Sequence, residues 1–203
     1  HWLDTEDTAY DGAAAQISRW RWDSMRITRR RLGCAWEDMY ATCVYAYLSR
    51  SGGFVNVHGD GAVAWQRADG HLTMVSFGWD EEPGAPGSVP AYPAYQHDDY
   101  EEFAAFYGGD LDAEKLTASR WECELGKSPV EVGAERYSLG VGMRGVTLPL
   151  YVPGLRFVAV FTDGVTRVDG MEWPDVVAEL MAFKTTAGKF AKRRMNRFLK
   201  DVR

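Results

Sequence analysis

The alternation of hydrophobic and polar positions along the chain predicts helices and strands in a mixed order. Apolar residues at helical spacing, with no proline among them, predict one long helix over residues 10–32. Four short apolar runs separated by glycine-containing turns predict strands over residues 42–48, 54–58, 62–66 and 71–77. Because the turns are too short for a helical crossover, we expect these four strands to form one antiparallel meander.

The second half of the chain predicts more strands and three more helices. Two or three strands are expected over residues 115–125 and 135–152 together, where Gly140, Gly142 and Gly145 interrupt the pattern, and one more over residues 157–162. Helices are expected over residues 98–107, 174–183 and 189–200, and a loop over the proline-rich residues 80–93. This order predicts one α+β domain over residues 1–203, a layered α-β-β-α sandwich with two mainly antiparallel sheets flanked by helices.

Two of the predicted strands end at an aspartate beside a glycine. The segment RFVAVFTDG has five apolar residues among the six at 157–162, which suits a strand covered on both faces, and it delivers Asp163 to the strand end. The segment FVNVHGDGAVAW places Asp60 in a Gly-Asp-Gly turn. Carboxylates at the ends of rigid strands can hold a metal ion or a reacting group. Aspartate-glycine pairs also form ordinary tight turns, which is the structural alternative for Asp60 in particular.

Composition and charge exclude several classes of protein. With 46% hydrophobic residues in 203, the chain is not disordered, and no apolar run approaches the length of a membrane helix, so we expect no membrane partner. Three cysteines without a CxxC pair argue against a disulfide framework and favour the cytoplasm. Residues 184–203 carry eight bases, yet apolar residues recur there at helical spacing, which favours a solvated helix face over a nucleic-acid surface.

The two aspartate-containing segments together resemble the metal-dependent type 2C protein phosphatases, especially their divergent bacterial branch. The resemblance is carried by VNVHGDGAVAW and FVAVFTDGVTRV, is supported by MEWPDVVAELMAF and KRRMNRFLK, and covers residues 42–203. It implies a phosphoprotein serine/threonine phosphatase with a binuclear Mn²⁺ or Mg²⁺ centre. Asp163 matches the aspartate of the family's Thr-Asp-Gly motif, a metal ligand, and Asp60 matches a turn aspartate close to the centre. The implied partners are a phosphorylated protein and its kinase.

Other parts of the family pattern are missing from this chain. The bridging Asp-Gly-x-Gly motif has one candidate, Asp11-Gly12-Ala13-Ala14, which lacks the second glycine and suits a helix start equally well. The arginine-rich opening motif and the terminal Asp-Asn or Asp-Asp motif are not seen. We therefore expect the chain to be incomplete at one or both ends, or the phosphatase to be degraded.

The ligand types themselves favour a hard cation. Mg²⁺ and Mn²⁺ prefer carboxylate and water oxygens, and the acids at strand ends supply them. A zinc site has little support, because His58, His71 and His97 are scattered and none lies at i, i+4 from another or beside a cysteine pair. Three hypotheses stay open: a metal-dependent phosphatase, an inactive phosphatase-like regulatory or binding domain, and a nucleic-acid binder that uses the last helix.

Overall fold

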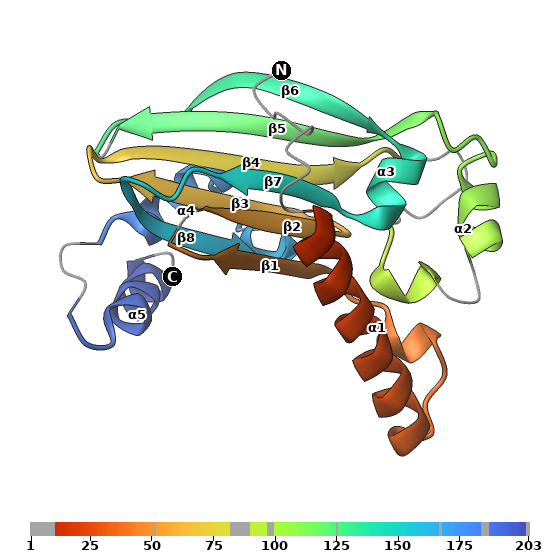
Figure 1. Ribbon diagram of the computed structural model, residues 1–203. Helices are drawn as coiled ribbons and strands as arrows, with labels where there is room; N and C mark the ends of the chain where they lie inside the picture. Colours follow the sequence, from red (N-terminus) through yellow and green to blue (C-terminus); the bar gives the residue numbers. More distant parts are fainter. Residues whose placement is uncertain are drawn as a thin grey trace.

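Two antiparallel sheets and their flanking helices make up the computed structural model, which describes residues 11–50, 52–81, 90–96, 100–124, 126–166, 168–183 and 187–201 (Figure 1). The larger sheet has five strands in the order β6-β5-β4-β3-β8, and the smaller has three in the order β1-β2-β7. The strands are β1 (Cys43–Leu48), β2 (Gly53–His58), β3 (Gly61–Arg67), β4 (His71–Trp79), β5 (Glu114–Glu124), β6 (Val130–Ser138), β7 (Val146–Leu150) and β8 (Leu155–Phe161).

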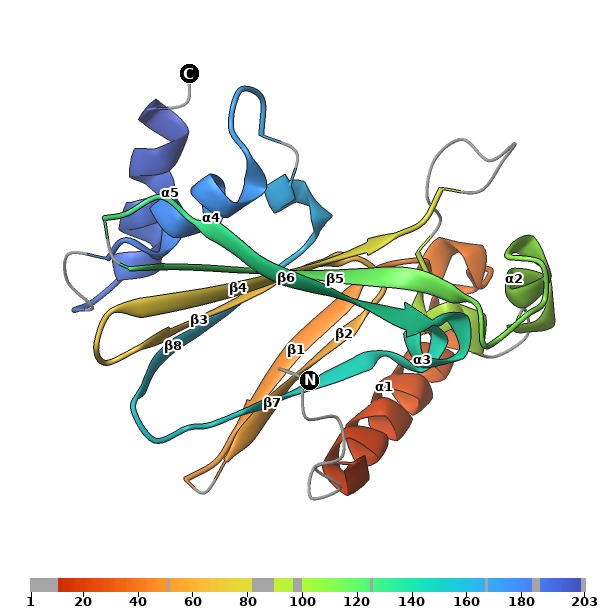
Figure 2. The ribbon, with the colours of Figure 1, turned by 90° about the horizontal axis from the view of Figure 1, so that it is seen from above.

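The main hydrophobic core lies between the two sheets. Val55 and Val57 of β2 and Leu148 of β7 pack there against Val63 of β3 and Val75 of β4. Alternate residues of these strands point into this core, as the pleat of a strand requires. Figure 2 shows the smaller sheet on one side of the larger one and the C-terminal helices on the other.

The helices occupy the outer layers and the ends of the sheets. The α-helices are α1 (Asp11–Leu32), α2 (Tyr100–Phe106), α3 (Leu139–Arg144), α4 (Trp173–Met181) and α5 (Phe190–Asp201), and the 3-10 helices are η1 (Glu37–Met39), η2 (Pro93–Gln96) and η3 (Asp163–Thr166). Helix α4 packs on the outer face of the five-stranded sheet through Val177 and Met181, and Phe198 of α5 packs against α4. The expected α+β sandwich of two antiparallel sheets with flanking helices is therefore confirmed.

The expected four-stranded meander is wrong. Strands β1 and β2 form one hairpin and β3 and β4 another, but the two hairpins belong to different sheets. The chain crosses between the sheets at Gly59 and Asp60, so β2 and β3 do not pair. All six residues of β2 are buried, because this strand is covered on both faces. A short glycine turn can either close a hairpin or lead the chain into the facing sheet, and its sequence does not distinguish the two. The sequence pattern therefore predicted a meander that the structure does not contain.

One further strand prediction is wrong, and another is confirmed only in part. Residues 139–144 form the short helix α3 between β6 and β7, although its glycines predicted a broken strand. Strand β8 is the edge of the five-stranded sheet and is only partly buried, with Val160 41% exposed. Both of its faces are nevertheless packed, because Val158 contacts the core between the sheets and Phe157 contacts the cluster under α4. Its outer edge has no neighbour within its own sheet, which explains the lower burial.

Some predictions fall partly outside the described residues. The expected loop over residues 80–93 is described only at its two ends, and the helix expected over 98–107 is seen as α2 from Tyr100 onward. His97 lies outside the described residues. In the described part of the chain, no helix has both the length and the apolar character needed to span a membrane.

Candidate functional site

The turn that carries Asp60 is fixed by backbone geometry that only glycine adopts easily. Gly59 has a φ of 104° and Gly61 a φ of 134°, both in the region that side chains disfavour. A Cβ at Gly61 would lie 2.6 Å from the Phe161 carbonyl oxygen, so the turn passes directly against the end of β8. The indole Nε1 of Trp79 donates a hydrogen bond of 3.0 Å to the Gly59 carbonyl oxygen. Asp60 is therefore held by a tight turn whose backbone is anchored from two sides.

Asp163 reaches the same place from the neighbouring strand. Strands β3 and β8 pair antiparallel, with Ala62 opposite Phe161. Asp60 lies two residues before Ala62, and Asp163 lies two residues after Phe161, at the first position of η3. Because the strands run in opposite directions, the start of one and the end of the other meet at the same edge of the sheet.

Both predicted aspartates line one cavity of about 330 Å³. Its other lining residues are Ala41, Thr42, Tyr92 and Thr162. The structure thus brings together the two carboxylates that the sequence singled out, although they lie in distant segments. That either side chain binds metal stays a prediction.

Thr42 makes the Asp60 carboxylate part of a local hydrogen-bond network. The Thr42 hydroxyl donates a hydrogen bond to Oδ1 of Asp60, across the gap between β1 and the turn. A Cβ at Gly59 would lie 2.8 Å from that hydroxyl, so the glycine also makes room for this contact. One carboxylate oxygen is thereby engaged within the protein, which supports the structural role considered for Asp60 and also orients its side chain.

The donor set of this cavity suits a hard divalent cation. Two carboxylates and two threonine hydroxyls supply oxygen atoms only, the ligand type that Mg²⁺ and Mn²⁺ prefer. Among the described residues, no group of three or more histidine, cysteine, aspartate or glutamate side chains is arranged to hold a metal. The described donors therefore fit one ion that keeps several waters, and a binuclear centre needs carboxylates from outside this set.

Thr42 and Tyr92 line the cavity but were not identified from the sequence. Thr42 lies just before β1, where nothing in the local pattern marks it as a partner of Asp60. Tyr92 belongs to an aromatic cluster with Tyr40 and Tyr95, at ring-centroid distances of 5.9 Å and 6.0 Å. The position of Tyr92 in a proline-rich segment is a signal for aromatic packing, but the sequence does not indicate which cavity its ring borders.

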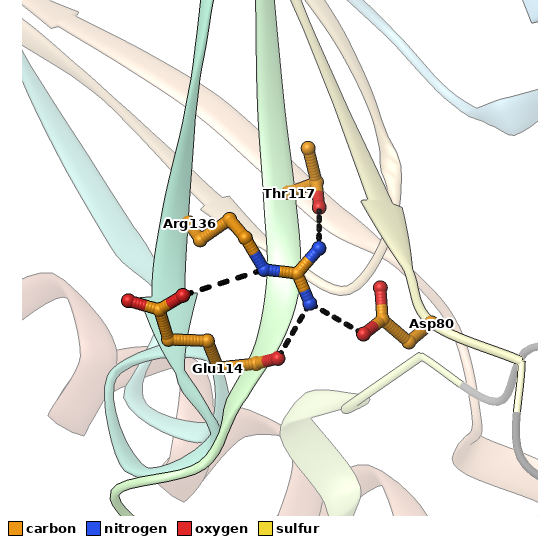
Figure 3. Close-up of polar contacts among 4 residues, drawn as sticks. All are labelled: Asp80, Glu114, Thr117 and Arg136. Atoms are coloured by element: carbon orange, nitrogen blue, oxygen red, sulfur yellow. Dashed lines mark hydrogen bonds and ion pairs between the residues drawn. The ribbon is translucent and has the colours of Figure 1, made fainter.

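Other candidate residues take structural positions. Asp11 is the first residue of α1, in agreement with its helix-start alternative. Asp80, directly after β4, accepts a hydrogen bond of 2.5 Å from Arg136 (Figure 3). The same guanidinium donates to the Thr117 hydroxyl and to the Glu114 carbonyl oxygen, at 3.2 Å and 2.6 Å. Arg136 thus ties β4, β5 and β6 together at one end of the sheet.

His58 is a buried neutral side chain that contacts the first helix. It is fully buried, and its Nδ1 accepts a hydrogen bond of 3.0 Å from Arg21 of α1. Burial lowers the pKa of His58 to about 3, and the positive charge of Arg21 acts in the same direction. A neutral imidazole that accepts from a guanidinium holds α1 against the outer face of the smaller sheet.

The three cysteines, Cys34, Cys43 and Cys123, are free thiols. Comparison of the chain with protein-family models, with curated proteins and with solved structures found no match.

Proposed function

We propose that this protein is a metal-dependent phosphatase that hydrolyses phosphate monoesters on serine or threonine residues of a partner protein. The observation that carries the proposal is the shared cavity of Asp60 and Asp163, at the paired ends of β3 and β8. Paired carboxylates can support several kinds of reaction. We favour phosphate-ester hydrolysis because the two segments that carry Asp60 and Asp163 resemble the type 2C phosphatases. The expected cytoplasmic location agrees with three free thiols and stays a prediction.

Asp163 and Asp60 are the residues that would hold Mn²⁺ or Mg²⁺, with Thr162 as a further oxygen donor on the cavity wall. Such an ion, when bound, lowers the pKa of a water molecule and neutralises charge on a phosphate ester. Thr42 would fix the orientation of the Asp60 carboxylate, leaving its second oxygen for the cation. The protein then contributes positioned oxygen ligands on rigid strand ends and no covalent nucleophile.

A phosphatase-like binding domain without catalysis is the second candidate. It is favoured by one observation: within the described ranges, no third acidic, histidine or cysteine side chain joins the two aspartates in a metal-binding group. Such a domain would keep the two-sheet fold and recognise a phosphorylated partner without hydrolysing it. It predicts no Mn²⁺ binding at the cavity.

Hydrolysis of p-nitrophenyl phosphate with and without Mn²⁺ tests the proposal. We expect Mn²⁺-dependent turnover, reduced at least about 100-fold in Asp163→Asn, because loss of a charged ligand weakens metal binding. Asp169→Asn is the matched control, since Asp169 also precedes a glycine but is exposed and outside the cavity. Absence of Mn²⁺-dependent turnover, or equal turnover in the Asp163 and Asp169 variants, contradicts the proposal. Isothermal titration with Mn²⁺ identifies the non-catalytic alternative, which shows neither turnover nor heat of binding.

A further inference from the structure

A second and larger cavity lies on the outer face of the five-stranded sheet, beside α4. Its volume is about 870 Å³, within the range of sites for small organic ligands. Its walls come from β3, β4, the turn between β5 and β6, and α4. None of its lining residues borders the cavity of Asp60 and Asp163.

The floor of this cavity contains a polar residue in an otherwise apolar row. Gln66 pairs with Leu72, and Leu72 pairs with Cys123, so the three side chains share one face of the sheet. Leu72 and Cys123 belong to the hydrophobic cluster that packs under α4, together with Met181. Gln66 is only 2% exposed and lines the cavity with them.

The amide of Gln66 has no protein partner within the part of the chain that the structure describes. Neither polar atom of this amide is among the fully buried side-chain atoms that lack a partner, so the amide reaches the space of the cavity. The Gln66 amide can therefore form a hydrogen bond with a ligand that enters the cavity.

The rim of the cavity is negatively charged. Glu172 and Asp175 of the α4 region line it and make no ion pair with any described residue. Two further acids are already paired, Glu124 with Lys127 at 2.6 Å and Glu179 with Arg194.

The charge of Asp175 acts inside the cavity as well as at its rim. Burial raises the pKa of the Cys123 thiol, and the negative charge of Asp175 raises it further. Lys127 also lines the cavity, but the acids outnumber it, and a cleft with apolar walls and an excess of negative charge concentrates cations.

We propose that this cavity binds an organic cation, an ammonium or guanidinium group on a short apolar stem. The cationic group meets Asp175 and Glu172, and the stem packs on Leu72 and Met181. A polar group at the other end of the ligand bonds to the Gln66 amide. The same chemistry is present in a free amine and in an arginine side chain of a partner protein. This site is independent of the proposed phosphatase activity.

Isothermal titration with two guanidinium probes, agmatine and N-acetyl-arginine amide, tests the proposal and separates the two sources. We expect saturable binding of both, at least about tenfold weaker binding of the neutral isostere N-acetyl-citrulline amide, and weakening by added salt. Tighter binding of agmatine assigns the site to free amines, and tighter binding of the arginine amide assigns it to a protein side chain.

Variants at the rim and floor make the test specific. Asp175→Asn should weaken binding of the tighter probe about tenfold, whereas Asp112→Asn, an exposed aspartate outside the cavity, should leave it unchanged. Gln66→Met should weaken binding several-fold while the melting temperature changes little, because the amide makes no hydrogen bond to a described residue. No saturable heat with either probe, equal affinity for the citrulline isostere, or unchanged affinity in Asp175→Asn overturns the proposal.

Discussion

Replacement of Gly142 by alanine tests how α3 supports the Asp60 turn. Gly142 is buried in α3, and an added Cβ would lie 2.5 Å from Cη2 and 2.9 Å from Cζ2 of Trp79. Normal carbon contacts are about 3.5–4.0 Å, so the ring or the helix must move by about 1 Å. The ring is 6% exposed and packs against Phe103 and Tyr107, so it has little room to move.

The magnitude follows from three contributions. Overpacking of a well-packed site costs about 1–3 kcal/mol. Movement of Trp79 also strains its hydrogen bond to the Gly59 carbonyl oxygen, worth about 1 kcal/mol. Alanine favours a helix over glycine by about 1 kcal/mol, which offsets part of the loss. We therefore expect Gly142→Ala to lower the free energy of unfolding by about 1–3 kcal/mol.

Urea unfolding followed by circular dichroism measures this change. Gly78→Ala is the matched control, because Gly78 lies in β4 beside Trp79 and an added Cβ meets no atom within 4 Å. Its backbone does not have a positive φ, so the control should be neutral or more stable by about 0.5 kcal/mol. If Gly142→Ala unfolds at the same or a higher urea concentration than the unmodified protein, the proposed close packing of α3 on Trp79 is wrong.

Three further predictions concern His58, Thr42 and Arg136. The pKa of folded His58, about 3, lies below its ordinary 6.5, so only the unfolded protein takes up this proton as pH falls. The free energy of unfolding should therefore fall by up to about 1.4 kcal/mol per pH unit as the pH drops from 6.5 to 3. In His58→Asn, the free energy of unfolding should depend less steeply on pH over this range than in the unmodified protein. Thr42→Val removes the hydroxyl that donates to Asp60. It should lower the free energy of unfolding in urea by about 1 kcal/mol and weaken Mn²⁺ binding in calorimetry. If neither value changes, this hydrogen bond has no role in stability or in metal binding. Arg136→Ala should cost only about 1 kcal/mol or less, since its ion pair with Asp80 is partly exposed, and a larger loss in thermal unfolding would show that the cluster is more than a surface contact.

The helices and most strands could be predicted because their signal is local. The apolar spacing of α4 and the unbroken pattern of α1 are complete within each segment. Helix α3 was missed because its glycines disfavour a helix, and Gly142 is explained only by its close contact with Trp79 of β4. The crossing between sheets at Gly59 was missed for a similar reason. The sequence of a tight turn does not determine whether the two strands that it joins pair with each other or lie in different sheets.

The candidate site was predicted in its residues but not in its arrangement. Asp60 and Asp163 each stand out locally as acids beside glycine at a strand end. Their meeting depends on the pairing of β3 with β8, which joins segments about half the chain apart. Thr42 and Tyr92 reach the same cavity from two further segments, and only the folded structure shows that they do.

A double-mutant cycle for Mn²⁺ affinity tests the central claim most directly. Affinity is measured by isothermal titration for the unmodified protein, Asp60→Asn, Asp163→Asn and the double variant. If both carboxylates hold one ion, each single change weakens binding at least about tenfold and the two effects are non-additive by about 1 kcal/mol or more. No Mn²⁺ binding by the unmodified protein, or losses that add within about 0.5 kcal/mol, would contradict a shared metal site.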